Sequence, residues 1–88
     1  MEKLTLVIPA KNESESLPIV LNELKSLKVK VVVVIPAEDN LTRQSIENFD
    51  CKIIEEKNGK GYGCALRTGI KQVDTEFFCI FNADASFN

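Results

Sequence analysis

Histidine is absent from the 88 residues of this chain. Without imidazole, the Ser-His and Cys-His forms of nucleophilic catalysis are excluded, and so are the usual histidine ligands of zinc. A metal ion bound by this chain is therefore expected to be held by oxygen atoms.

The chain also lacks an excess of positive charge. It has 11 lysines and arginines against 13 aspartates and glutamates, for a net charge of −2, and its basic residues are scattered along the sequence. Proteins that bind nucleic acid usually concentrate basic residues on one surface. Nucleic acid is therefore not the expected partner.

Cysteines are few and long hydrophobic runs are missing. Cys51, Cys64 and Cys79 are odd in number, have no C-x-x-C spacing and lie in or beside apolar segments. This is typical of small core residues in a reduced protein, so we predict a cytoplasmic location. The longest apolar run, residues 31–37, is far shorter than the roughly 20 residues that a membrane span needs, and the N-terminus has no apolar segment of signal-peptide length. We expect no membrane span in this chain.

The composition is that of a folded domain. With 88 residues, of which 44% are hydrophobic and 27% are charged, the chain has room for one hydrophobic core. We therefore expect a single domain over residues 1–88.

Short apolar runs alternate with stretches of helical periodicity. The expected strands are LTLVI (residues 4–8), VKVVVVI (29–35), CKIIEE (51–56) and TEFFCIF (75–81). The first helix is expected to begin near Ser14 or Ser16, and the second to be capped by Asn40 or Thr42. The third follows three closely spaced glycines and is expected to bury a face that includes Ile70.

This alternation predicts an α/β fold with the order β-α-β-α-β-α-β. Right-handed crossovers favour an open, mostly parallel, Rossmann-like sheet with strand order 3-2-1-4 and helices on both faces. In such sheets ligands bind at the carboxyl ends of the strands, near the switch between the first and fourth strands. Polar segments follow three predicted strand ends, at residues 9–13, 35–39 and 82–84. We expect a binding site there.

Taken singly, the polar segments each have two interpretations. Asn82 and Asp84 have the spacing of an Asp-x-Asp metal motif, or they form an Asx turn after a strand. Residues 59–61 offer amides and a lysine to a phosphate at the start of a helix, or they form an ordinary turn. The loop at residues 9–13 either contacts a nucleoside or is a capped loop, and Arg67 by itself is typical of a solvated helix face.

Three segments together resemble a known family. LVIPAKNESESLPIVLNEL, NGKGYGCALRTGI and FFCIFNADASFN resemble the N-terminal half of family-two, GT-A-fold inverting glycosyltransferases, and within them the dolichyl-phosphate mannosyltransferase-like and polyprenyl-phosphate glycosyltransferase group. The resemblance covers nearly the whole chain. It implies half of a GT-A fold that binds a nucleotide-diphosphate sugar, and hexosyl transfer to a lipid phosphate or a saccharide.

The resemblance also implies which residues bind. Those implied to border the nucleotide sugar are Pro9, Ala10, Asn12, Glu13, Gly59, Lys60, Gly61 and Arg67. Glu38 and Asp39, in the loop after the second expected strand, are predicted to complete this site. Those implied to hold Mg²⁺ or Mn²⁺ are Asn82, Asp84 and Ser86. No catalytic residue is assigned, because in the family the catalytic base and the acceptor-binding segments follow the metal motif. The isolated chain is therefore expected not to turn over.

The sequence departs from the family at its acidic positions. The family's second strand usually ends in V-V-D-D-G-S-x-D-x-T, whereas Ile35 and Pro36 replace the two aspartates here, and the metal motif begins with Asn82. An amide oxygen can coordinate Mg²⁺ or Mn²⁺ but supplies no charge. We expect weak metal binding.

An alternative function belongs to a different class. The chain could be a degenerate, non-catalytic scaffold or interaction module, because the expected strand at residues 75–81 would be an exposed apolar edge. Such edges pair with other chains, so this alternative predicts a homo-oligomer. A receiver-like or flavodoxin-like domain has the same topology, but the acidic cluster or phosphate loop that it needs after the first strand is absent.

Overall fold

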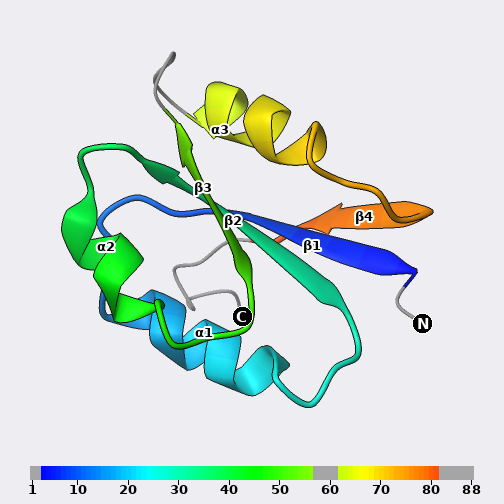
Figure 1. Cartoon of the computed structure of the whole chain (residues 1–88), viewed down its shortest axis with the longest axis horizontal. Coiled ribbons are helices and arrows are strands. Elements are labelled where there is room, and N and C mark those ends of the chain that lie inside the picture. Colours follow the sequence, from blue (N-terminus) through cyan, green and yellow to red (C-terminus); the bar gives the residue numbers. More distant parts are fainter. Residues whose placement is uncertain (1–2, 57–61, 82–88) are drawn as a thin grey trace.

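The computed structural model describes residues 3–56 and 62–81, in which strands and helices alternate as predicted (Figure 1). The elements are β1 Leu4–Pro9, α1 Ser16–Leu24, β2 Lys30–Pro36, α2 Asn40–Ser45, β3 Lys52–Glu56, α3 Tyr62–Ile70 and β4 Phe77–Ile80.

The strands form one parallel sheet with the order β3-β2-β1-β4. Val7 in β1 pairs with Val32 in β2 on one side and with Ile80 in β4 on the other. In Figure 1, α3 covers one face of the sheet, and α1 and α2 lie on the other. The predicted α/β fold, strand order and placement of helices on both faces are confirmed.

The two central strands are buried on both faces, which explains their continuous apolar sequences. Successive side chains of a strand point to opposite faces. The side chains on one face pack with α1 and with the segment after α2 and form a core cluster. The buried members of this cluster are Ile8, Ala10, Leu17, Leu21, Val33, Ile35 and Ile46. The alternate set, which includes Val7 and Val34, lies under α3.

The helix α3 approaches the sheet through a glycine. A Cβ atom added to Gly69 would lie 2.5 Å from Val7 Cγ1 and 2.9 Å from Val34 Cγ2, which is too close for any side chain. The predicted burial of Ile70 is wrong, since 40% of this residue is exposed. The helix turns its small residue to the sheet because contact at this distance leaves no room for a larger one.

The helix starts differ in part from the prediction. Helix α1 begins at Ser16, as expected, but without a side-chain cap; instead, the Ser16 hydroxyl donates a hydrogen bond to the Glu13 carboxylate. Helix α2 is capped by Asp39, so the predicted caps Asn40 and Thr42 are wrong. Asp39 has non-helical backbone angles, and its Oδ1 accepts from the Thr42 N–H at 3.3 Å, which is the geometry of an N-cap residue.

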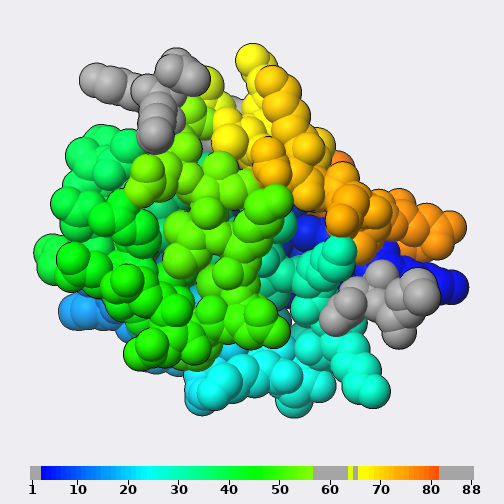
Figure 2. All heavy atoms as spheres, in the orientation of Figure 1, coloured from blue at the N-terminus to red at the C-terminus, as the bar shows by residue number. Residues whose placement is uncertain are grey.

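Strand β4 is an edge strand of the described sheet and pairs with β1. It lies at one side of the molecule in Figure 2. Of its side chains, Phe77 is 61% and Phe78 is 42% exposed, so the predicted exposed apolar edge is confirmed. No helix in the described part of the chain is long and apolar enough to cross a membrane.

Candidate functional site

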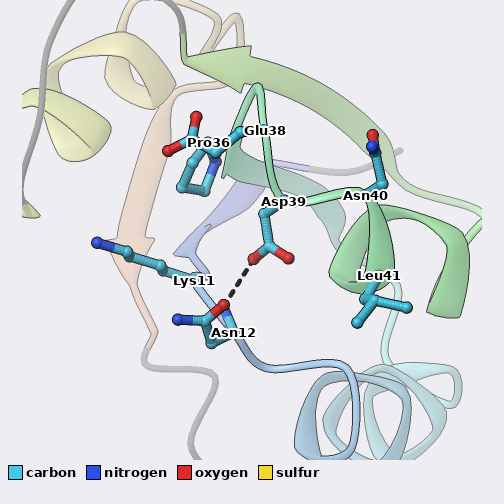
Figure 3. A pocket seen from close by; sticks show the side chains of 7 residues that line it. All are labelled: Lys11, Asn12, Pro36, Glu38, Asp39, Asn40 and Leu41. Atoms are coloured by element: carbon cyan, nitrogen blue, oxygen red, sulfur yellow. Dashed lines mark hydrogen bonds between the residues drawn. The ribbon is translucent and has the colours of Figure 1, made fainter.

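A pocket of about 370 Å³ lies beyond the carboxyl ends of β1 and β2 (Figure 3). These adjacent parallel strands end at Pro9 and Pro36, so the loops that follow them emerge side by side. The pocket is lined by Lys11, Asn12, Pro36, Glu38, Asp39, Asn40 and Leu41. It lies at the carboxyl ends of the strands, between the first and second strands rather than at the predicted switch between the first and fourth.

The loop after β1 contains a backbone conformation that few residues adopt. Asn12 has a φ of 56°, in the left-handed region, which asparagine tolerates better than most residues with a side chain. Its N–H donates to Asp39 Oδ2 at 2.7 Å, across 27 positions of sequence. This bond, drawn as a dashed line in Figure 3, joins the loop after β1 to the loop after β2.

Asp39 accepts further hydrogen bonds from Thr42. The Thr42 hydroxyl donates to Asp39 Oδ2 at 2.7 Å, and the Thr42 N–H donates to Oδ1. Burial raises the pKa of the Asp39 carboxyl, but the hydrogen bonds from Asn12 and Thr42 and the charge of Lys11 together outweigh burial and hold the pKa below its ordinary value. Asp39 is therefore ionised at neutral pH.

Thr42 joins the same two loops a second time. Its buried hydroxyl oxygen accepts the N–H of Glu13 at 3.0 Å while the hydroxyl proton goes to Asp39. We name these two residues the Asp39–Thr42 clamp, because together they bind the consecutive N–H groups of Asn12 and Glu13. The sequence prediction considered Thr42 only as a possible cap and missed this role.

Arg43 fixes the outer side of the second loop. One of its guanidinium nitrogens donates to the Glu55 carboxylate of β3, and another donates to Asn40 Oδ1 at 2.6 Å. The start of α2 is thereby tied to β3.

Some of the predicted site residues meet at this pocket. Asn12, Glu38 and Asp39 line it together. Pro9 and the buried Ala10 carry the loop without lining the pocket, and Glu13 is directed to Ser16.

Lys11 and Asn40 also line the pocket, beside the predicted residues, and two further lining residues were missed. Pro36 appeared in the sequence only as the replacement of an acidic residue, and Leu41 carried no signal, because nothing in its local pattern shows that 72% of it is exposed beside a pocket.

Other predicted residues lie away from the pocket or outside the described part of the chain. Arg67 is exposed on α3 and is not among the residues that line it. The predicted nucleotide-binding residues Gly59, Lys60 and Gly61, and the predicted metal ligands Asn82, Asp84 and Ser86, lie outside the described residues. Within residues 3–56 and 62–81, no group of three or more acidic or cysteine side chains could hold a metal ion.

The pocket presents groups of complementary character. Lys11 supplies a cation, Glu38 an exposed carboxylate, and Pro36 and Leu41 apolar surface. An ammonium group only donates hydrogen bonds and an ionised carboxylate only accepts them. Such a set suits a small polar ligand that also has an apolar part.

Comparison with known proteins identifies a family and a fold. The profile of the family described as "Glycosyl transferase family 2" matches residues 5–88. Among solved structures, mannosyl-3-phosphoglycerate synthase from Rubrobacter xylanophilus is similar, with a TM-score of 0.86 and 15% sequence identity over 99% of this chain. This similarity confirms the GT-A type of fold. The chain spans 33% of the length of that synthase. A search of curated proteins found no match.

Proposed function

The chain belongs to glycosyl transferase family 2, and from this membership we propose that it binds a nucleotide-diphosphate sugar as a glycosyl donor. The observation that supports the proposal is the pocket beyond β1 and β2, which lies at the carboxyl ends of the strands, the side of a parallel α/β sheet on which ligands bind. We propose residues 1–88 as a single domain, the nucleotide-sugar-binding half of a glycosyltransferase.

The proposed site divides the donor between two sets of residues. The nucleoside lies in the pocket, where Leu41 and Pro36 contact the base and Glu38 accepts hydrogen bonds from base or ribose. Lys11 attracts the phosphate charge. The family resemblance also assigns residues 59–61 and Arg67 to the nucleotide sugar, and we keep them in the proposal, with the amides and the lysine of residues 59–61 as candidates for phosphate contacts.

The proposal includes a weakly bound metal ion. GT-A glycosyltransferases commonly use a divalent metal ion, and Asn82, Asp84 and Ser86 are proposed to hold Mg²⁺ or Mn²⁺. Such an ion would neutralise the charge that develops on the departing diphosphate. Because Ile35 and Pro36 stand where the family has aspartates, we propose that the ion binds weakly.

The proposed reaction of the whole enzyme is inverting hexosyl transfer to a lipid phosphate or a saccharide, as in the dolichyl-phosphate mannosyltransferase-like group. The isolated chain is proposed to bind the donor without transferring it. The cytoplasmic location stays a prediction from the sequence.

Calorimetric titration tests the proposal. UDP-sugars and GDP-sugars are titrated into the chain with and without Mn²⁺, and at least one is expected to bind. Lys11→Met should weaken that binding by about 10-fold, the loss expected when one charged contact to phosphate is removed. Lys28→Met is the matched control, since Lys28 is exposed and does not line the pocket. No heat from any nucleotide sugar, with Mn²⁺ present, would refute the donor-site proposal.

A second candidate function rests on the exposure of β4. The N–H of Phe77 donates to the carbonyl oxygen of Lys3, directly before β1, and the N–H of Phe81 donates to that of Val7 in β1. In a parallel pair the alternate residues, here Phe78 and Ile80, direct their N–H groups to the opposite edge. As the alternative, we propose that the chain is a non-catalytic scaffold that self-associates through this strand.

Sedimentation at increasing concentration tests the second candidate. The chain is expected to form an oligomer, and Phe78→Lys is expected to give a monomer because charge on an edge strand opposes pairing. Ile19→Lys, which changes an exposed residue of α1, is the control and should keep the oligomer. A clean monomer of the unmodified chain at high concentration would rule this candidate out.

A further inference from the structure

We propose that the Asp39–Thr42 clamp positions the loop after β1 for ligand binding, so that Asp39 and Thr42 control donor affinity without contacting the donor. This inference rests on the proposed donor site and assigns a positioning role within it.

The clamp satisfies two consecutive backbone donors of that loop. The Asn12 N–H donates to Asp39 Oδ2 at 2.7 Å, and the Glu13 N–H donates to Thr42 Oγ1 at 3.0 Å. Thr42 is buried, so its hydroxyl has no competing contact with water. The loop is thus held by side chains at the start of α2 rather than by its own turn.

Lys11 lies between two anchored positions. On one side, the N–H of Ala10 donates to Val34 O in β2 at 2.9 Å. On the other side, Asn12 is held by Asp39 in its left-handed conformation. The backbone of Lys11 therefore has little freedom to move, and its side chain reaches the pocket wall shown in Figure 3. Release of Asn12 would let the loop relax to a commoner conformation and would displace Lys11.

Asp39 has little capacity left for a ligand. An ionised carboxylate offers about four acceptor positions. Two on Oδ2 are taken by Asn12 and Thr42, and one on Oδ1 is taken by the Thr42 N–H. A direct contact from Asp39 to a donor molecule would have to use the single remaining position or break the clamp.

Three variants of the clamp test the inference. Asp39→Asn keeps the shape and the capping ability but cannot accept all three hydrogen bonds. Thr42→Val keeps the shape but removes the hydroxyl, and Thr42→Ser is the matched control that restores it. Each variant is titrated with the UDP-sugar or GDP-sugar that the unmodified chain binds best, well below its melting temperature.

Asp39→Asn and Thr42→Val are each expected to weaken binding by about 10-fold, because a lost hydrogen bond to an ionised group changes affinity on this scale. Thr42→Ser keeps the hydroxyl, so its affinity should stay within about twofold of the unmodified chain. Amide hydrogen exchange at Asn12 and Glu13 should accelerate in the two weakened variants and not in Thr42→Ser. A role confined to fold stability would lower the melting temperature and leave the affinity of the folded chain unchanged.

Three results would overturn the inference, and they are distinguishable. If the unmodified chain binds a nucleotide sugar and both weakened variants bind it equally well, the clamp has no positioning role, although the proposed function stands. If Asp39→Asn loses binding while Thr42→Val keeps it, Asp39 contacts the donor itself and the positioning role is also wrong. If the unmodified chain binds no nucleotide sugar, the proposed function fails and the inference falls with it.

Discussion

Gly69 of α3 lies against Val7 of β1, so close that an added Cβ atom would be 2.5 Å from Val7 Cγ1. Val7 is buried in a central strand, and Val34, the other neighbour of the glycine, is buried in the adjacent strand. Neither side chain can move without disturbing a close-packed interior. The distance between α3 and the sheet therefore depends on the absence of a side chain at position 69.

Gly69→Ala should lower the free energy of unfolding by about 1–3 kcal/mol, the usual cost of overpacking. Alanine favours a helix over glycine by about 1 kcal/mol, but the clash with two buried side chains exceeds this gain. Urea denaturation measures the difference. Arg67→Ala, on the exposed side of the same helix, is the control and should change stability by no more than about 0.5 kcal/mol. A Gly69→Ala variant as stable as the unmodified chain would contradict the prediction.

Replacing Thr5 or Thr75 by valine should cost different amounts of stability. Thr5 is 1% exposed, and its Oγ1 lies 2.6 Å from Thr75 Oγ1. The Thr75 hydroxyl donates to Phe77 O at 2.7 Å, so Thr5 must supply the proton between the two threonines. Thr75→Val strands the buried Thr5 hydroxyl and should cost about 1–3 kcal/mol, whereas Thr5→Val removes that hydroxyl and should cost about 0.5–1.5 kcal/mol.

Urea denaturation gives the order of the two threonine variants, and hydrogen exchange at the Phe77 amide reports whether β4 has loosened. The double variant should be closer in stability to Thr5→Val than to the sum of the two single changes. A larger cost for Thr5→Val than for Thr75→Val would show that the proton assignment is wrong.

At position 12, glycine should give a more stable chain than alanine, the reverse of the usual order. Since its φ is 56°, alanine at this position pays about 1 kcal/mol for the left-handed conformation, whereas glycine adopts it without steric cost. Asn12→Gly should therefore be more stable to urea than Asn12→Ala. Ser26→Gly and Ser26→Ala serve as the control, because Ser26 is exposed after α1 and does not have the left-handed conformation. Equal stability of the two Asn12 variants would argue against the left-handed conformation in solution.

Asp39 predicts part of the acid dependence of stability. Its pKa in the folded chain lies below the ordinary value of 3.8, because hydrogen bonds and Lys11 outweigh the effect of burial. A lowered folded pKa gives a stabilisation that is present above the ordinary pKa and disappears as the pH falls through the folded pKa. The stability difference between the unmodified chain and Asp39→Asn should therefore be constant above about pH 5 and shrink below 3.8.

Thermal unfolding from pH 2.5 to 7 measures this difference. The pKa of Asp74 is also lowered, chiefly by its hydrogen bond to Lys30, and Asp74→Asn controls for that second carboxylate. A difference between the unmodified chain and Asp39→Asn that stays the same across the whole range would contradict the assignment.

The strands were predictable because their signal is local. The β-branched runs of β1 and β2 identify strands buried on both faces, whatever the rest of the chain does. The cap of α2 was harder, since Asp39, Asn40 and Thr42 are all good capping residues and lie within one turn of each other. Only the backbone angles select among them.

The meeting of the two loops that line the pocket was predictable, but their contacts were not. Chain connectivity brings the loops after β1 and β2 to one edge, so Asn12, Glu38 and Asp39 were expected near each other. Their roles were not predictable, because the same acidic residue can bind a ligand or a backbone amide, and the sequence does not distinguish the two. Leu41 was missed for a similar reason: exposure depends on what packs against a residue.

The sequence by itself determined the alternation of strands and helices and, through the handedness of crossovers, the order β3-β2-β1-β4, because periodicity and connectivity are properties of the chain. Only the tertiary structure decided that Asp39 binds the amide of Asn12, and that a glycine rather than Ile70 faces the sheet from α3. Both depend on distances of a few ångströms between segments far apart in sequence, which are settled only when the elements pack.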